Sequence, residues 1–263
     1  MNEKIKELFE LIIKAKYCVA LTGAGVSTLS GIRDFRGKNG LYKEIDAEKI
    51  FDINVFFRDP SFYYSQSKDF IYGLDKKIPS VVHTTLGKLE ERGYLKSIIT
   101  QNIDLLHTKG GSKKVIEIHG SAKAHYCPKC RSSADAEEAI LLEKVRESGF
   151  MEYEEAAAIV QSGGLPRCKK CNTVLKPAIT FFGENLPVYA LSMAEKESNA
   201  ADLMLVLGTS LTVYPAAGLP QIILRNRGKI VIVNEMETPL DNYAVLSFKE
   251  LEPVFSGISL LLE

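Results

Sequence analysis

The 263-residue chain is 46% hydrophobic and 25% charged, which is typical of a soluble globular protein with one large domain or one domain and a smaller insert. Its formal net charge is zero, from 33 basic and 33 acidic residues, so bulk electrostatics gives no reason to expect nucleic acid or a membrane surface as a partner. Because no apolar run approaches the roughly 20 residues that span a bilayer, and the charged N-terminal segment lacks a signal-peptide core, we expect a cytoplasmic protein.

Helical and strand patterns alternate along most of the chain. Residues 3–15 carry apolar side chains at helical spacing, and helical patterns recur at 83–93 and 190–200. Short apolar runs of the kind that form buried parallel strands lie between these patterns. The expected strands are Tyr17–Thr22, Ser97–Thr100, Lys114–Ile118, Leu203–Gly208 and Lys229–Asn234. This alternation predicts an α/β fold with a parallel sheet.

Two segments interrupt the alternation. Residues 38–82 hold aromatic residues and turn formers without a clear strand pattern, and residues 121–176 carry two cysteine pairs around a charged helical stretch. We interpret them as two insertions that together build a smaller domain beside the sheet. The large domain then comprises residues 1–37, 83–120 and 177–263.

A glycine-rich segment, LTGAGVSTLSG, follows the first expected strand. Gly23 and Gly25 permit a sharp turn and the close approach of a ligand, and a helix beginning near Val26 would offer free N–H groups to a phosphate. The third position of the dinucleotide pattern G-x-G-x-x-G is Thr28 rather than glycine. From the glycines alone, a tight strand-to-helix turn explains the segment equally well.

The continuation GIRDFRG places Asp34, Phe35 and Arg36 in a glycine-flanked segment that need not be regular structure. A mobile loop with one carboxylate, one ring and one guanidinium would close over a bound nucleotide. The alternative is a surface loop in which the carboxylate and the guanidinium pair with each other, which contributes little energetically.

Four cysteines form two Cys-x-x-Cys pairs, Cys127/Cys130 and Cys168/Cys171. They supply four thiolates for a tetrahedral Zn²⁺, although residues 131–167 form a longer spacer than the usual 15–20 residues. The alternative is a redox-active pair, but such a motif normally lies at a strand-helix junction, where we expect neither pair. We therefore predict one structural zinc ion, without an open coordination position for catalysis.

The histidine that the sequence places best for catalysis is His119, because KVIEIHG delivers it to the end of a buried strand. Open α/β sheets bind ligands at such ends, and a neutral imidazole there would act as a general base near pH 7. A structural role is the alternative. For His83, His107 and His125 we expect structural roles: a position in a helix cap, a hydrogen bond, and a place beside the zinc site.

Polar residues also follow three other expected strands. They are suited to ribose hydroxyls and a carboxamide, and in a parallel sheet they would lie along the same edge as His119. A polar ligand at this edge explains why strand 97–100 continues into QNID. These residues are Gln101, Asn102, Asp104, Thr209, Ser210, Asn234 and Glu235.

Together, these motifs resemble the sirtuins, which are NAD-dependent protein-lysine deacylases. GAGVS, GIRDFRG, TQNID, the IHG around His119, both Cys-x-x-Cys pairs, FFGENLP, GTSLTVYPAA and VIVN occur in the family's order along nearly the whole chain. The resemblance implies a Rossmann-type large domain and a small domain with a helical module (38–82) and a zinc-binding module (121–176). NAD and an acyl-lysine protein or peptide would meet in the cleft between the domains.

The resemblance also implies residue roles. His119 and Asn102 would be catalytic, and Cys127, Cys130, Cys168 and Cys171 would bind zinc. The peptide substrate would contact Thr180 and would lie between two strands, one formed by Phe182, Gly183 and Glu184 and the other by Val213 and Tyr214. The residues in contact with NAD would be Gly23, Ala24, Gly25, Thr28, Asp34, Phe35, Arg36, Gln101, Asn102, Ile103, Asp104, His119, Gly208, Thr209, Ser210, Asn234, Glu235 and Leu251.

The implied reaction removes an acetyl or other neutral acyl group and produces nicotinamide, free lysine and O-acyl-ADP-ribose. Two departures from the family bear on acyl preference: Arg33 replaces the usual proline of GIPDFR, and Thr180 lies where the backbone would meet the acyl-lysine amide. Succinyl-preferring members carry Tyr-x-x-Arg in the helical module. Here Gln66 and Ser67 stand three residues after the two tyrosines, so neutral acyl groups are favoured.

Other functions share parts of this pattern. Mono-ADP-ribosyl transfer would use the same first step, and a non-catalytic NAD or ADP-ribose-binding module would need neither His119 nor an intact QNID. A hydride-transferring dehydrogenase would leave FFGENLP and the cysteine pairs unexplained. The sequence leaves the oligomeric state open and is compatible with a monomer.

Overall fold

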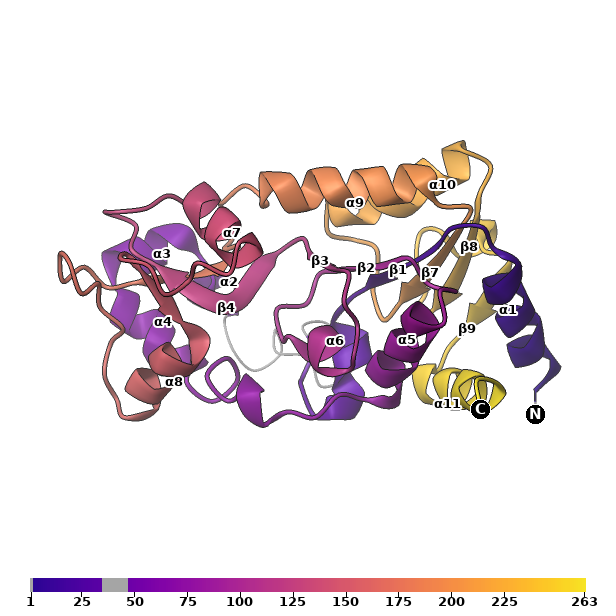
Figure 1. Cartoon of the computed structure of the whole chain (residues 1–263), viewed down its shortest axis with the longest axis horizontal. Helices are drawn as coiled ribbons and strands as arrows, with labels where there is room; N and C mark the ends of the chain where they lie inside the picture. The colour runs from indigo at the N-terminus through magenta and orange to yellow at the C-terminus, as the bar shows by residue number, and fades with distance from the viewer. Residues whose placement is uncertain (1, 35–46) are drawn as a thin grey trace.

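The computed structural model describes residues 2–34 and 47–263. A larger lobe built on a parallel sheet carries both chain termini, and a smaller lobe lies at the other end of the molecule (Figure 1). No helix in the described part of the chain is both apolar enough and long enough to reach across a lipid bilayer.

Within the described residues, six parallel strands form the larger sheet, in the order β3-β2-β1-β7-β8-β9. In chain order this is 3-2-1-4-5-6, the Rossmann order, which changes direction between β1 and β7. The first five strands confirm the expected apolar runs, whereas β9 is short and half-exposed and went unpredicted. The strands are β1 (Cys18–Thr22), β2 (Ser97–Thr100), β3 (Val115–Glu117), β7 (Leu203–Leu207), β8 (Lys229–Val233) and β9 (Leu246–Phe248).

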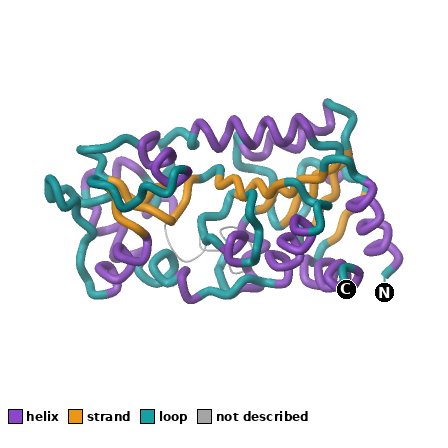
Figure 2. Tube along the Cα trace, in the orientation of Figure 1, coloured by secondary structure: helices purple, strands orange, loops and turns teal. Residues whose placement is uncertain are grey.

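Helices cover both faces of this sheet (Figures 1 and 2). Each turns apolar side chains towards the strands, as Ile5, Leu8 and Ile12 do from the first helix. One face carries α1 (Glu3–Lys14), α5 (Val81–Glu91) and α11 (Leu251–Leu261), and the other carries α9 (Val188–Ala200) and α10 (Leu219–Arg225).

The smaller lobe combines both insertions around one apolar core. Phe56 and Tyr63 from the first insertion pack with Met151 and Val160 from the second. This shared core confirms a smaller domain built from two insertions, while the limits 38–82 and 121–176 stay a prediction. Its elements are α2 (Ala47–Ile50), α3 (Ile53–Arg58), α4 (Pro60–Ser67), β4 (Gly120–Tyr126), α7 (Ser133–Leu141), β5 (Phe150–Glu152), α8 (Tyr153–Gln161) and β6 (Lys176–Ile179), with β4 antiparallel to β5 and β6.

Two expected helices differ from the observed ones. The helix expected near Val26 is a 3₁₀-helix that begins at Ala24. The helix in the charged stretch between the cysteine pairs ends at Leu141, because Glu143 adopts a left-handed backbone conformation (φ 55°) that an α-helix does not accommodate. The remaining short helices are the 3₁₀-helices η1 (Ala24–Ser30), η3 (Leu74–Lys76), η4 (Ala216–Gly218) and η5 (Asp241–Tyr243), and α6 (Leu106–Lys109).

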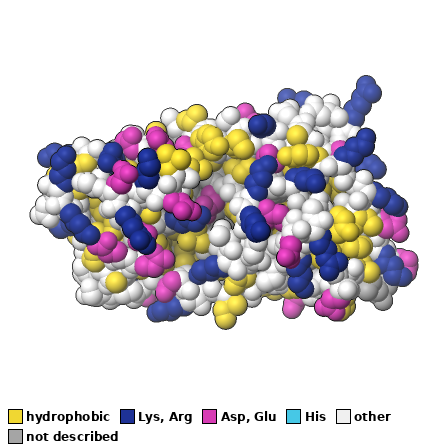
Figure 3. Space-filling model, viewed as in Figure 1, with side chains coloured by type: hydrophobic (Ala, Val, Ile, Leu, Met, Phe, Trp, Pro, Cys, Tyr) yellow, Lys and Arg dark blue, Asp and Glu magenta, His cyan; other side chains and the backbone are white. Residues whose placement is uncertain are grey.

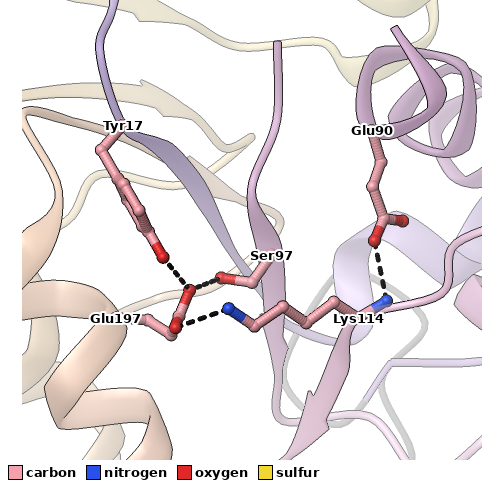
Figure 4. A network of polar contacts seen from close by, with 5 residues as sticks. All are labelled: Tyr17, Glu90, Ser97, Lys114 and Glu197. Atoms are coloured by element: carbon pink, nitrogen blue, oxygen red, sulfur yellow. Dashed lines mark hydrogen bonds and ion pairs between the residues drawn. The ribbon is translucent and has the colours of Figure 1, made fainter. Parts of the chain in front are cut away.

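A polar network joins the amino ends of three strands to α9 (Figure 4). The carboxylate of Glu197 accepts hydrogen bonds from Tyr17 Oη (3.0 Å), Ser97 Oγ (2.7 Å) and Lys114 Nζ (2.6 Å). These three donors precede or begin β1, β2 and β3, and the Glu197 side chain is only 4% exposed. Glu90 of α5 adds a hydrogen bond from the backbone N–H of Lys114 (2.7 Å). The network therefore fixes the sheet at the edge opposite the strand ends predicted to bind a ligand.

Replacing Glu197 with glutamine should lower the free energy of unfolding by about 1–3 kcal/mol at pH 7, because the buried side chain at this position no longer accepts from all three donors. Burial opposes ionisation, but the hydrogen bonds from Lys114, Ser97 and Tyr17 outweigh it and lower the pKa of Glu197. A carboxyl group with a lowered pKa stabilises the fold above its unfolded pKa and loses this effect as pH falls through its folded pKa.

Urea unfolding at several pH values measures this difference, which should shrink in acid. Glu195→Gln, at an exposed position of the same helix, is the matched control and should change stability by no more than about 0.5 kcal/mol. Equal losses for the two variants would contradict a role for the network.

Candidate active site

The carboxyl ends of the parallel strands lie along one edge of the larger sheet. Thr22 at the end of β1 is in register with Thr100 of β2 and Leu207 of β7, and Leu207 is in register with Val233 of β8. This confirms the expectation that the polar strand ends share an edge, at the switch point where open α/β sheets bind ligands. Gly23, Gln101, Gly208 and Asn234 directly follow these strands, and His119 lies two residues beyond β3, whose Glu117 is in register with Thr100.

The glycines after β1 and β7 allow the backbones of the two loops that follow these strands to lie in direct contact. A Cβ on Gly23 would lie 2.8 Å from Gly208 O, and one on Gly25 would lie 2.7 Å from Gly208 Cα. Gly208 itself adopts φ 58°, and a Cβ there would lie 2.6 Å from Val26 N. The close approach that these glycines permit is therefore one between two parts of the chain, and it sets the shape of the loops at the switch point.

Ser27, which sequence reasoning missed, lies at the centre of the site. Its buried hydroxyl donates to Asp104 Oδ2 (2.6 Å) and accepts from Asn102 Nδ2 (3.1 Å). Asn102 Nδ2 also donates to Gly23 O (3.1 Å), and Asp104 Oδ1 accepts from the backbone N–H of Leu106 (2.9 Å). Because these polar groups satisfy one another, the orientations of Asn102 and Asp104 are fixed. The signal in the sequence was the serine of GAGVS, beside the glycines.

Two buried histidines contact Ser27 of this network and Thr22 at the end of β1. His83 Nδ1 accepts from Ser80 N–H (3.0 Å), so its other nitrogen carries the proton and lies 3.4 Å from Ser27 Oγ. His107 Nε2 lies 2.9 Å from Thr22 Oγ1. Burial lowers the pKa of His83 to about 4 and that of His107 to about 3, so both are neutral at pH 7. The predicted helix-cap position of His83 is confirmed by its capping box with Ser80, and the predicted hydrogen bond of His107 is the one to Thr22.

His125 is likewise structural. It is buried and bonded to Tyr72 Oη at 2.7 Å, and burial lowers its pKa to about 3. It lies outside the cluster of four cysteines, as predicted.

His119 lies in the turn between β3 and β4 and is only partly buried. Its Nδ1 is 2.9 Å from the carbonyl oxygen of Gln101. Since a carbonyl only accepts hydrogen bonds, Nδ1 carries the proton and Nε2 has the free lone pair. Burial lowers the pKa of His119, although the bond to Gln101 opposes this, so the imidazole is neutral at pH 7. A neutral imidazole held in this tautomer is able to accept a proton.

The residue after His119 must be glycine. Gly120 adopts φ 77°, and a Cβ there would clash with the backbone of Ala178 and lie 2.9 Å from Ile179 Cα in β6. The carbonyl of His119 also accepts from the backbone N–H of Thr180 (2.8 Å). The chain around His119 is therefore tied directly to β6 of the smaller lobe.

The predicted residues on the other side of the switch point are partly engaged with one another. Gln101 Nε2 donates to Thr209 Oγ1 (2.9 Å), and Ser210 Oγ is 2.9 Å from Thr212 Oγ1. Asn234 Nδ2 donates to Met236 O (2.9 Å). These bonds hold hydroxyl and amide groups at the ends of β2, β7 and β8.

The remaining predicted contacts of NAD are spread around this edge. Thr28 is exposed and donates its hydroxyl to Gly25 O, and Ile103 packs against the core of the smaller lobe. Ala24 and Asp34 are half-buried, Glu235 is exposed, and Leu251 begins α11. Phe35 and Arg36 lie outside the described residues.

Two segments were predicted to bind the peptide as strands, and neither is a strand. Phe182 N–H donates to Phe51 O (2.7 Å), and Phe182 O accepts from Ile53 N–H (3.1 Å); both partners belong to the smaller lobe. The chain then turns at Gly183, which adopts φ 92°. Val213 and Tyr214 lie in a bend that leads into a 3₁₀-helix. The side chains of Phe182 (46% exposed) and Tyr214 (68% exposed) still present apolar surface to a ligand.

The surface seen in Figure 3 carries basic and acidic side chains intermixed, without one large field of a single sign. This distribution agrees with the zero formal net charge of the chain.

The four paired cysteines converge on one point of the smaller lobe. All their Sγ atoms lie within 4.8 Å of one another, with Cys171 Sγ 3.4 Å from Cys127 Sγ and 3.5 Å from Cys130 Sγ. A tetrahedral Zn²⁺ with Zn–S bonds of about 2.3 Å places its sulfurs about 3.8 Å apart, so the cluster, completed by Cys168, fits a structural zinc ion.

The expectation that neither cysteine pair lies at a strand-helix junction is wrong for the first pair. Cys127 and Cys130 lie between β4 and α7, because the capping box of Ser132 and Asp135 begins a helix directly after the knuckle. The metal interpretation stands, because a redox pair needs two thiols and here four converge.

Known proteins with similar sequences are NAD-dependent deacetylases and deacylases. A sequence model of the Sir2 family matches residues 23–215. An NAD-dependent protein deacetylase of Thermotoga maritima is 44% identical over 245 residues, covering 93% of this chain and 92% of that protein. NAD-dependent protein deacylase 2 of Archaeoglobus fulgidus is 36% identical over 242 residues, covering 92% of this chain and 88% of that protein.

Solved structures of Sir2 proteins share the whole fold. One with a deacetylated p53 peptide and 3′-O-acetyl-ADP-ribose has a TM-score of 0.85 at 41% identity, covering 98% of this chain and 97% of that one. Another, with a p53 peptide and NAD⁺, has a TM-score of 0.82 at 40% identity, covering 99% and 98%. The chain therefore belongs to the Sir2 family, the sirtuins.

Proposed function

We propose that the protein is an NAD-dependent protein-lysine deacylase that transfers a neutral acyl group from lysine to ADP-ribose. The observation that carries the proposal is the tautomer of His119, whose free Nε2 lies at the same sheet edge as the buried network of Ser27, Asn102 and Asp104. The relatives described above are named NAD-dependent deacetylases or deacylases, and Sir2 structures hold NAD⁺, acyl peptides or acetyl-ADP-ribose.

NAD is proposed to bind along the carboxyl edge of the larger sheet, in contact with the eighteen residues that the resemblance assigns to it. Gln101 and Asn102 would face the reacting ribose, and Ile103 and Asp104 the nicotinamide carboxamide. Gly208, Thr209, Ser210 and Asn234 would lie on the adenosine side, with Leu251 as a backbone contact. Their satisfied hydrogen bonds support this placement, because preorganised polar groups bind without rearranging.

The chemistry follows from what these groups can do. The acyl oxygen of the substrate lysine attacks C1′ of the ribose, and the C1′–N bond electrons leave with nicotinamide. Polar rather than cationic side chains near the sugar favour the positive charge that develops there. His119 Nε2 then accepts the proton of a ribose hydroxyl, whose oxygen attacks the acyl carbon. The carbonyl of Gln101 stabilises the imidazolium that forms, and one water completes the release of free lysine and O-acyl-ADP-ribose.

Zinc would be held by Cys127, Cys130, Cys168 and Cys171, where it supplies structural cross-linking of two turns. Thiolate ligands at all four positions leave no place for a metal-bound water.

A neutral acyl group is supported by the composition of α4. Tyr63, Tyr64 and Ser67 are buried in the core of the smaller lobe, and Ser67 Oγ donates to Tyr63 O (2.7 Å). None of these side chains offers a cation to a succinyl carboxylate. We also place the protein in the cytoplasm, because its paired cysteines converge as metal ligands rather than as disulfides.

The proposal is tested with purified protein, NAD and an acetyl-lysine peptide. Nicotinamide release that requires the peptide, without NADH formation, is the expected result. Release without the peptide and transfer of ADP-ribose to protein would favour mono-ADP-ribosyl transfer. Binding of NAD without any release, with acetyl and longer acyl peptides alike, would favour a non-catalytic binding module.

A further inference from the structure

A lysine side chain is buried directly beneath the segment predicted to bind the peptide. Lys176 of β6 is 1% exposed, and its ammonium donates to Glu184 Oε2 (2.8 Å), Ile179 O (2.8 Å) and Pro177 O (3.2 Å). An ammonium has three N–H donors, and here each has an acceptor.

Two aromatic rings complete the surroundings of this charge. Lys176 Nζ lies 4.2 Å from the ring centroid of Phe181 and 5.6 Å from that of Tyr126. Taking an ammonium out of water costs several kcal/mol unless it is paired and hydrogen-bonded. Burial lowers the pKa of Lys176, and the neighbouring Glu184 carboxylate opposes this. A buried charge with this many partners constrains the chain that supplies them.

The chain that supplies them is the segment Ile179–Glu184, which wraps around the ammonium. Glu184 Oε2 also accepts from the backbone N–H of Phe181 (2.8 Å), and Glu184 N–H donates to Phe181 O (3.1 Å). The carboxylate that pairs with Lys176 therefore also closes the turn at Gly183.

This segment contacts His119 near its start, and the chain beyond its end is held by α7 of the smaller lobe. Thr180 N–H donates to His119 O (2.8 Å). Farther along, Glu137 of α7 accepts from the backbone N–H groups of Ala190 (2.8 Å) and Tyr189 (3.4 Å) at the start of α9. Within the segment, Phe182 N–H donates to Phe51 O (2.7 Å) and Phe182 O accepts from Ile53 N–H (3.1 Å), and the pair of Lys176 and Glu184 holds the turn at Gly183 that follows.

We propose that Lys176 is a positioning residue for the peptide substrate. Its ammonium, through Glu184, sets the backbone of Thr180–Glu184 and so the surface on which the acyl-lysine peptide lies beside His119. The inference rests on the proposed deacylase function. None of the residues in contact with this ammonium is among the proposed contacts of NAD, so NAD binding should not depend on it.

The test measures KM for an acetyl-lysine peptide and for NAD separately in Lys176→Met and Glu184→Gln. We expect the peptide KM to rise by about tenfold or more in Lys176→Met, with the KM for NAD changed by less than about twofold. Lys176→Arg, which keeps the charge, should restore much of the peptide affinity. Lys14→Met, which removes an exposed lysine of α1 paired with Glu10 at 2.7 Å, is the matched control and should leave both constants unchanged.

If Lys176 had a purely structural role, its replacement would raise the KM for peptide and the KM for NAD together and lower the thermal midpoint, which would overturn the inference. An unchanged peptide KM in both variants would also overturn it. If Lys176→Met does not fold, Glu184→Gln decides, because its side chain is 19% exposed and the amide still accepts from Phe181 N–H. Absence of deacylation by the unaltered protein would instead reject the proposed function, so the two failures are distinguishable.

Discussion

Replacing His119 with alanine should lower the rate of deacetylation by about 10²–10⁴-fold, the usual contribution of a general base. The bond from Nδ1 to the carbonyl of Gln101 leaves Nε2 as the only lone pair of the ring, and alanine has no group that accepts the ribose proton. NAD binding should persist, because the polar groups at the ends of β2, β7 and β8 stay in place. Steady-state kinetics and titration with NAD measure the two effects.

The pH dependence gives an independent check on the same residue. Burial lowers the pKa of His119 below its ordinary value of 6.5, although its bond to Gln101 opposes this. The neutral ring is the base, so kcat/KM should be constant around pH 7 and fall as pH drops through the lowered pKa. An acid limb above pH 6.5, or a loss of less than about fivefold in His119→Ala, would contradict this role.

Replacing Cys171 with alanine should remove the zinc ion and unfold much of the smaller lobe. The four sulfurs link the turn between β4 and α7 to the turn before β6, which no continuous helix or strand connects. Losing a structural zinc ion costs several kcal/mol, and 1 kcal/mol corresponds to about 2–4 °C for a chain of this size. We therefore expect the thermal midpoint to fall by about 10 °C or more.

Activity should be lost with the ion even though zinc makes no bond to substrate. Glu137 of α7, which follows the first cysteine pair, accepts from N–H groups at the start of α9, and this contact holds the helix that follows the peptide-binding segment. Metal analysis and calorimetry check the prediction. Cys18→Ala is the control, because Cys18 is buried in the larger lobe outside the cluster. The absence of zinc from the unaltered protein, or equal losses of stability and activity in Cys171→Ala and Cys18→Ala, would contradict the prediction.

The parallel sheet could be predicted from the sequence because its central strands are buried on both faces. Such strands are continuous apolar runs, as in LMLVL at Leu203–Leu207, and their signal does not depend on their neighbours. β9 is half-exposed, and β4 reads GSAKAHY, with a lysine exposed in the middle. Strands of this kind are defined by their pairing partners, which local pattern does not reveal.

Within the site, residues that belong to a sequence motif could be predicted one by one. Their hydrogen bonds to residues distant in the sequence could not. His119 follows a buried strand, so its position could be predicted, whereas its tautomer depends on the distant carbonyl of Gln101. Ser27 acquires its role from Asn102 and Asp104, which are far away in the sequence. The resemblance implied strands for the peptide-binding segments, but their conformation depends on tertiary contacts such as the backbone bonds of Phe182 to the first insertion.

The buried pair of Lys176 and Glu184 shows the same limit. In the sequence, KPAITFFGE contains two ordinary charged residues, and nothing local distinguishes them from a solvated surface pair. Only the fold places the lysine under two aromatic rings and within hydrogen-bond distance of the turn that it stabilises.

The most direct test of the central claim is the identity and stoichiometry of the products. A reaction of the purified protein with NAD and an acetyl-lysine peptide, stopped within the first turnovers and examined by mass spectrometry, should contain nicotinamide, deacetylated peptide and O-acetyl-ADP-ribose in equal amounts. Free acetate without O-acetyl-ADP-ribose, ADP-ribosylated peptide that keeps its acetyl group, or NADH in place of nicotinamide would contradict it.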